Sequence, residues 1–171
     1  LLAGKLDATA TAQAGVPLKV TASLQALQAG AKPGWLVPVD LQATASLPPA
    51  GAAAFDLQGS DAAKHLQFRA SGQYDLATGA GKLRFAVPPL EFAGDKLQPV
   101  DVAPVVKPWI SETTGKLALS GHLSWAAGQA PKSDLRLLVE DLSFTAGSLG
   151  VAQLNSVIAL SQIGPPVTAA R

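Results

Sequence analysis

The sequence contains no cysteine and no methionine. The lack of cysteine excludes a disulfide framework and a thiolate metal site, and it is compatible with either a reducing or an oxidising compartment. The chain begins at Leu1, and no basic segment followed by an apolar one marks a signal peptide. We therefore expect a piece of a longer protein, with any signal or membrane anchor outside these 171 residues.

Long apolar runs and aromatic side chains are also scarce. No apolar stretch reaches the roughly 18 residues that a transmembrane helix needs. Aromatic residues make up only 5% of the chain, and alanine supplies much of the 48% that is hydrophobic. Small side chains of this kind fill the interior of a thick β-sandwich poorly, so the sequence is short of material for a two-layer core.

The chain also lacks an excess of positive or negative charge. The 13 basic and 12 acidic residues are dispersed along the chain and leave a net charge of +1. The absence of a basic stripe argues against nucleic-acid binding, and the absence of a basic cluster argues against binding to an anionic membrane surface.

What the sequence does contain is a regular alternation of apolar and polar side chains, which is typical of half-buried β-strands. Residues 4–14 and 18–27 alternate throughout and are joined by a turn at residues 15–17, so they predict a hairpin. A shift in the alternation at Glu140-Asp141 indicates a β-bulge. Further strands are predicted over residues 35–47, 53–58, 64–76, 82–87, 114–125, 135–144 and 149–163.

Segments between these strands show turn, loop and helix signals. The pairs Pro48-Pro49 and Pro88-Pro89 are expected to end the strands that precede them, and residues 93–98 are expected to form a loop. Residues 101–111 are the only candidate helix, with Asp101 as its N-cap and Pro108 as a limit on its length.

Together these patterns predict an all-β fold, a long antiparallel meander in a single sheet segment over residues 1–171. Because one face of each strand is apolar, the sheet must cover that face by closing as a barrel, by curving over itself, or by binding an apolar molecule. We expect a curved, trough-like sheet with an apolar inner face, with or without one short helix near residues 101–111. If the chain is cut from a longer sheet, its unpaired edge strands favour self-association.

Side chains that could perform catalysis or bind a metal are few. Residues 77–83 lack both the first glycine and the final Ser or Thr of a phosphate-binding loop. His65 and His122 alternate with apolar neighbours on predicted polar faces, and no carboxylate follows at metal-ligand spacing. Glu140 and Asp141 are adjacent, so they point to opposite faces of a strand. We expect a protein that is not an enzyme, with no catalytic residue, metal site or cofactor.

The carboxy-terminal third carries a series of more specific motifs. They are Pro-Val-Val-Lys-Pro-Trp-Ile at 104–110, Thr-Gly-Lys-Leu at 114–117, Gly-His-Leu-Ser-Trp at 121–125, Leu-Ser-Phe-Thr at 142–145, Leu-Asn-Ser-Val-Ile at 154–158 and Pro-Pro-Val-Thr at 165–168. In these motifs, over about residues 104–168, the chain resembles the YdbH-like proteins of the AsmA-like superfamily.

This resemblance implies a long envelope protein of Gram-negative bacteria, anchored in the inner membrane and extending across the periplasm. Proteins of this kind form a curved antiparallel sheet whose hydrophobic inner groove carries phospholipid acyl chains toward the outer membrane. The resemblance therefore implies phospholipid as the ligand, an inner-membrane anchor in the missing part of the chain, and a partner in the periplasm or outer membrane. The chain lacks an anchor and is too short to bridge two membranes, so it would be one segment of the groove.

Strand parity and the resemblance together nominate residues that line such a groove. They are Val39, Leu41, Leu66, Phe68, Leu83, Phe85, Leu117, Leu119, Leu123, Leu135, Leu137 and Val139. The same side chains could instead form a closed core. Two other functional classes stay open on the sequence, namely a closed β-barrel that carries one hydrophobic ligand and a structural or adhesive β-module that binds none.

Overall fold

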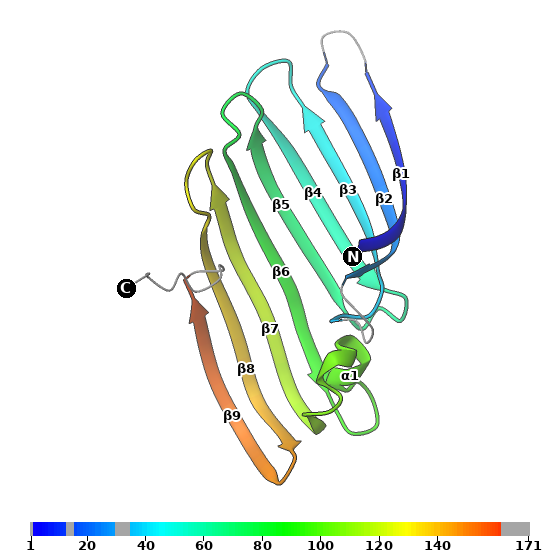
Figure 1. Cartoon of the computed structure of the whole chain (residues 1–171), viewed down its shortest axis with the longest axis vertical. Helices are drawn as coiled ribbons and strands as arrows, with labels where there is room; N and C mark the ends of the chain where they lie inside the picture. The colour runs from blue at the N-terminus through cyan, green and yellow to red at the C-terminus, as the bar shows by residue number, and fades with distance from the viewer. Residues whose placement is uncertain (1, 13–15, 30–34, 162–171) are drawn as a thin grey trace, which may run out of the picture.

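The computed structural model describes residues 2–12, 16–29 and 35–161, and these form one curved antiparallel sheet (Figure 1). Its nine strands lie side by side in chain order, so the predicted meander is confirmed. The strands are β1 (Leu2–Thr11), β2 (Leu18–Ala29), β3 (Val39–Leu47), β4 (Ala52–Asp61), β5 (Gln67–Asp75), β6 (Gly81–Phe92), β7 (Ser111–Trp125), β8 (Lys132–Ala146) and β9 (Leu149–Leu160).

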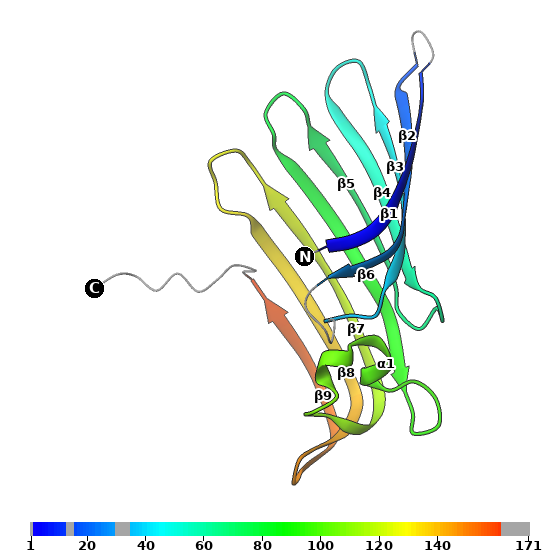
Figure 2. The same cartoon turned by 45° about the vertical axis from the view of Figure 1, so that its right-hand side comes forward.

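The sheet is open. Each described strand pairs only with its neighbours in the chain, so β1 and β9 form the two edges and do not meet. Figure 2 shows that the edges curve toward the same side without joining. The closed-barrel interpretation is therefore wrong for the part of the chain that the structure describes.

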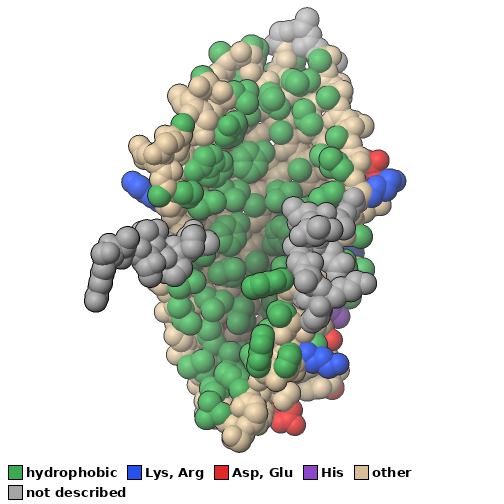
Figure 3. Space-filling view, viewed as in Figure 1, with side chains coloured by type: hydrophobic (Ala, Val, Ile, Leu, Met, Phe, Trp, Pro, Cys, Tyr) green, Lys and Arg blue, Asp and Glu red, His purple; other side chains and the backbone are tan. Residues whose placement is uncertain are grey.

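One face of the sheet is apolar and the other is polar, because the register keeps side chains of one kind in line. Leu41 pairs with Gly59, and Gly59 pairs with Phe68. Directly opposed residues project from the same face of a sheet. Figure 3 looks onto this apolar face, where hydrophobic side chains spread from one end of the sheet to the other.

Strand β6 runs through the two prolines that were expected to end it. Its pairing with β5 stops at Ala86, and its pairing with β7 shifts register between Val87 and Leu90. Pro88 and Pro89 thus lie in a bulge, on a stretch of β6 that pairs with β7 alone. Few partner carbonyls there need an amide donor, so the two missing N–H groups cost few hydrogen bonds. The expected end at Pro88 is wrong because proline is tolerated at such an irregular edge.

Other predicted boundaries differ by a few residues. Strand β3 begins only at Val39, since Pro38 has no amide hydrogen to donate. Strand β4 continues to Asp61, beyond the predicted end at Gln58, because Gly59 and Asp61 still pair with β3. Predicted strand residues 13–14 and 162–163, the first turn residue Gly15, and the motif at 165–168 lie outside the described residues.

The helical segment is shorter than residues 101–111 and begins earlier. Helix α1 spans Pro99–Val102, and a 3₁₀ turn follows over Pro104–Val106. The N-cap is Gln98 rather than Asp101. The Asp101 carboxylate accepts a 2.8 Å hydrogen bond from the backbone amide of Gln98. Pro99 suits the first helical position because it has no N–H to leave unpaired. Pro104 disfavours helical geometry at Ala103, and so it separates the two turns.

Several bulges bend the sheet at the end where α1 lies. Ala26, Asp141 and Gln153 have φ angles of 51°, 47° and 52°, which extra residues in bulges adopt. Their amides donate 2.9 Å hydrogen bonds to side chains of adjacent strands, namely Asp40, Asn155 and Ser143 respectively. The bulge predicted at residues 140–141 is confirmed by the register shift between Val139 and Leu142.

Candidate functional site

Within residues 2–12, 16–29 and 35–161, the apolar face has no second layer over most of its area. The chain exposes 11781 Å², whereas a compact protein of 17.3 kDa would expose roughly 7800 Å². On the edge strand β9, Leu154, Ile158 and Leu160 are 39%, 42% and 47% exposed. Apolar side chains in this arrangement shield one another only from the sides, so much of the face stays in contact with solvent.

The predicted groove residues lie together on this face. Leu83 pairs with Leu123, Leu119 with Leu137, and Leu117 with Val139. The remaining strand residues of the set belong to the same rows, which include Leu41, Phe68, Phe85 and Leu135. Leu66 stands just before β5, with the parity of Phe68, and packs in a buried cluster with Val39. Strand parity was therefore sufficient to group these twelve positions.

The rows contain one charged side chain among the described residues. Asp61 pairs with Val39 and is only 6% exposed. Its carboxylate accepts hydrogen bonds from the amides of Leu66 at 2.7 Å and Ala63 at 3.2 Å, inside the β4–β5 turn. A buried carboxylate is tolerable when amides satisfy it, so Asp61 serves the turn and leaves the remainder of the face apolar.

Glycines on the apolar face create room for large neighbours, a feature that the sequence analysis did not identify. A Cβ on Gly59 would collide with the Phe68 ring and approach Leu41 Cδ2 to 2.7 Å. A Cβ on Gly81 would likewise collide with the ring of Trp125. Trp125 also stacks on Tyr74, with ring centroids 6.5 Å apart. Glycine in a strand often signals a close approach, and this was the available clue.

A short segment covers one end of the apolar face. We call residues 93–110, which include α1, the strap. Figures 1 and 2 both place α1 in front of this face, near the end of β6. Val102 and Leu97 of the strap form a buried cluster with Phe92, Val39 and Leu66.

The strap divides the predicted groove residues into two sets. Val39 and Leu66 belong to the buried cluster beneath it, and Leu41 and Leu117 pack against that cluster. The other eight lie outside this cluster, although two of them, Leu135 and Val139, are only 6% and 4% exposed. The eight are Phe68, Leu83, Phe85, Leu119, Leu123, Leu135, Leu137 and Val139.

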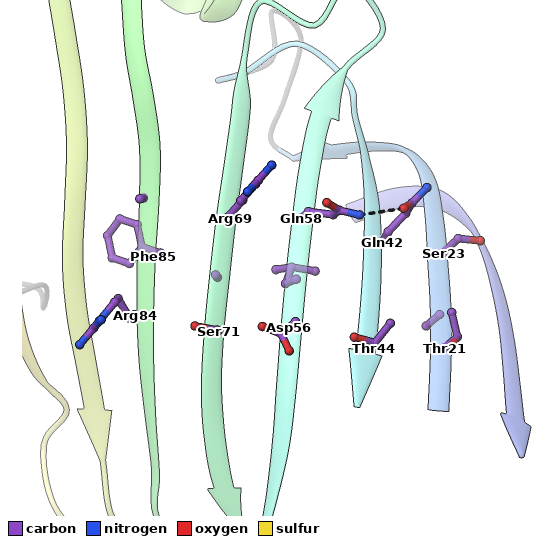
Figure 4. Close-up of a pocket in the computed structure, with 14 residues that line it drawn as sticks. Thr21, Ser23, Gln42, Thr44, Asp56, Gln58, Arg69, Ser71, Arg84 and Phe85 are labelled. Atoms are coloured by element: carbon purple, nitrogen blue, oxygen red, sulfur yellow. Dashed lines mark hydrogen bonds between the residues drawn. The ribbon is translucent and has the colours of Figure 1, made fainter. Parts of the chain in front are cut away.

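The opposite face of the sheet is polar and contains a shallow hollow of about 770 Å³ (Figure 4). Gln58 and Gln42 are linked there by a 3.0 Å hydrogen bond, and Arg84 donates a 3.0 Å bond to His122 on β7. The polar side chains that line the hollow are Thr21, Ser23, Gln42, Thr44, Asp56, Gln58, Arg69, Ser71 and Arg84. Ala22, Leu57, Ala70, Phe85 and Ala86 also line the hollow, so it presents both polar and apolar groups.

An ion pair joins β6 and β7 on the polar face. The Lys116 ammonium lies 2.8 Å from the Glu91 carboxylate. The hydrogen bond and charge of Lys116 lower the pKa of Glu91, and Glu91 in turn raises the pKa of Lys116. Within the described residues, no group of three or more His, Asp or Glu side chains is placed to hold a metal ion.

A comparison with family models identifies the chain. The model described as "YdbH-like: Intermembrane phospholipid transport protein YdbH" matches residues 1–170. The chain belongs to the YdbH-like family. The resemblance seen over residues 104–168 therefore extends over the whole chain. No curated protein and no solved structure matches this YdbH-like chain.

Family membership associates this YdbH-like chain with phospholipid transport between membranes. Transport of that kind belongs to the cell envelope, in agreement with an envelope or periplasmic location. Among the described residues, no helix has both the length and the apolar character needed to cross a membrane. The described part of this YdbH-like chain thus has a largely uncovered apolar face, and its family is associated with phospholipid transport.

Proposed function

We propose that this chain is one segment of a periplasmic, bridge-like lipid transfer protein whose apolar face carries phospholipid acyl chains between the inner and outer membranes. The observation that carries the proposal is the continuity of the apolar rows from β1 to β9, in a layer that the described residues leave largely uncovered. The family description supports phospholipid as the ligand. In this proposal the rest of the protein supplies the inner-membrane anchor, and a further partner receives the lipid.

The physical basis is burial of acyl chains against the apolar face. Each methylene that leaves water gains about 0.8 kcal/mol, so a chain lying along the strands is strongly favoured over one in the periplasm. The charged headgroup stays at the open side, in water, because burying its phosphate would be costly. A face with similar apolar rows along its length has no deep trap, and movement requires no chemical step. In this proposal the protein therefore moves lipid without catalysing a reaction.

Charge inserted on the apolar face tests this function. Leu119→Asp and Leu137→Lys place an ion among paired leucines of β7 and β8, where its desolvation costs several kcal/mol. We expect each to slow phospholipid transfer by about tenfold or more. Ser120→Asp is the matched control, since Ser120 is exposed and pairs with Arg136 on the polar face. Transfer is measured with the intact protein in cells, by the delivery of labelled phospholipid to the outer membrane.

Unfolding and abundance of each variant must be measured in parallel. If the inward variants are folded and abundant and still transfer lipid normally, the proposed function is wrong for this segment. If they unfold while Ser120→Asp does not, the apolar face acts as a closed core in the intact protein. That outcome would favour the structural β-module that binds no ligand.

A further inference from the structure

The strap leaves no path for an acyl chain beneath it. Val102, Leu66 and Leu97 are 6%, 6% and 8% exposed, and they form one buried cluster with Val39 and Phe92. Side chains packed at the density of a protein interior leave no channel the width of a hydrocarbon chain. The apolar face over β3 to β6 is therefore closed at this end.

The strap is also held firmly in place. The Gln98 side-chain amide donates to the carbonyls of Ala93, Leu97 and Thr113 at 2.8, 3.2 and 2.9 Å, and its oxygen accepts from the Thr113 amide at 2.9 Å. On the far side, the Val37 amide donates a 3.0 Å bond to the Val102 carbonyl. Opening the strap would break these bonds and expose the buried cluster, so it acts as a fixed obstacle rather than as a loose lid.

Beside the strap, the apolar face continues over β8 and β9. Leu142 pairs with Leu154, and Phe144 pairs with Val151. We call these four residues the lane. Leu142 contacts the cluster under the strap, and Leu154, on the edge strand, is 39% exposed. Figure 3 shows uncovered hydrophobic side chains beside the strap, on the side of β8 and β9.

Two bulges keep the lane on the apolar face. On β8 the alternation shifts at residues 140–141, and on β9 it shifts at Gln153. One uncompensated extra residue would turn every later side chain to the polar face. Because each strand carries its own bulge, the side chains after the shift stay on the face that Leu137 and Ile158 occupy. The pair directly before the shift is Val139 with Ser156, so one hydroxyl group lies between the two apolar stretches. Asp141 and Gln153 adopt positive φ, a geometry that non-glycine residues rarely adopt, in the positions that preserve this continuity.

We propose that the strap diverts acyl chains into the lane, so that lipid passes this end of the sheet along β8 and β9 rather than beneath α1. The inference rests on the proposed function, since it specifies the route of the same ligand. The lane has no charged side chain, and it continues the rows that contain Leu137 and Ile158. Within the lane, Leu142 lies on the side nearest the strap and Leu154 lies at the sheet edge.

Site-specific photocrosslinking in the intact protein in cells tests the route. A benzophenone side chain is placed singly at Leu119 on the open face, at Leu154 in the lane, or at Val157, which pairs with Leu138 on the opposite face. Phospholipid attached after irradiation is detected by mass spectrometry. We expect labelling at Leu119 and Leu154, with only background at Val157. Labelling at Leu119 with only background at Leu154 would overturn the lane and leave the proposed function standing. Background at Leu119 would overturn the proposed function itself, and the lane with it.

A covalent lock distinguishes passage beside the strap from passage under it. The sequence has no cysteine, so Val37→Cys with Val102→Cys provides a single pair in this segment, at positions already joined by a backbone hydrogen bond. We expect the oxidised, locked protein to keep its labelling at Leu154. Loss of that labelling on oxidation, with recovery on reduction, would show that lipid needs an open strap and would overturn the proposal. Leu154→Asp provides an independent arm, because it should slow transfer by about tenfold or more while Val157→Asp does not. Equal transfer by the two folded variants would also overturn the lane.

Discussion

Gln98 and Thr113 exchange a pair of hydrogen bonds that ties the strap to the start of β7. The side-chain nitrogen Nε2 of Gln98 donates to the backbone carbonyl of Thr113. The backbone amide of Thr113 donates to Oε1 of Gln98, and both bonds measure 2.9 Å. Thr113 is 2% exposed, so water has little access to either backbone group. One side chain thus satisfies both backbone groups of a buried residue in the adjoining strand.

Gln98→Ala should destabilise the protein by about 1–3 kcal/mol, because it leaves the buried Thr113 amide and carbonyl without partners. Urea unfolding monitored by tryptophan fluorescence measures the loss. Gln129→Ala, in the exposed turn between β7 and β8, is the matched control and should have little effect. Equal stability of the two variants would show that the strap does not depend on Gln98.

Gly59→Ala should destabilise the protein although alanine has less backbone entropy to lose. The new Cβ would collide with Phe68 and lie 2.7 Å from Leu41 Cδ2, and overpacking of this kind costs about 1–3 kcal/mol. Gly94→Ala is the control, since a Cβ there has no neighbour within 4 Å. Thermal unfolding of both variants provides the test, and a Gly59→Ala melting temperature at or above that of Gly94→Ala would contradict the packing.

Acidification should weaken the turn between β5 and β6. Amides of Thr78 and Ala77 donate to the Asp75 carboxylate at 3.1 and 2.8 Å, and these bonds lower the pKa of Asp75 from its ordinary value of 3.8. A lowered pKa in the folded state means that the bonds contribute stability above the unfolded pKa and lose it as the pH falls below that value. Asp75→Asn should therefore flatten the decline of melting temperature between neutral and acidic pH. A decline as steep as that of the unchanged protein would remove Asp75 as a contributor.

The expressed segment should self-associate through its sheet edges. Strand β9 carries no charged residue and no proline, the two devices that most often protect an edge. We expect the apparent mass in light scattering to rise with concentration, and Val157→Lys, on the polar face of β9, to reduce the rise. A constant monomer mass over a wide concentration range would contradict this expectation.

The sequence by itself determined the strands, their two faces and the twelve apolar positions. Alternation at period two is a local property, so Leu119 and Leu137 could be assigned to one face before their pairing was known. The bulge at Glu140-Asp141 could be predicted from the shifted alternation for the same reason. The boundaries that failed, at Pro88 and at Asp101, depend on what lies beside the segment: a bulge with one neighbouring strand in the first case, and Gln98 in the second.

Only the tertiary structure decided that the sheet stays open and that the strap covers one end of its apolar face. Pairing of β1 with β9 would be a long-range contact, and no periodic pattern in either strand specifies or forbids it. The strap is placed by contacts between residues far apart in the chain, such as the Val37–Val102 hydrogen bond and the buried cluster that includes Leu66 and Leu97. These contacts separate Val39 and Leu66, which are buried under the strap, from Leu119 and Leu137 on the open face. Side-chain parity is the same for both sets, so it could not show which positions the strap covers, because that depends on contacts between residues far apart in the chain.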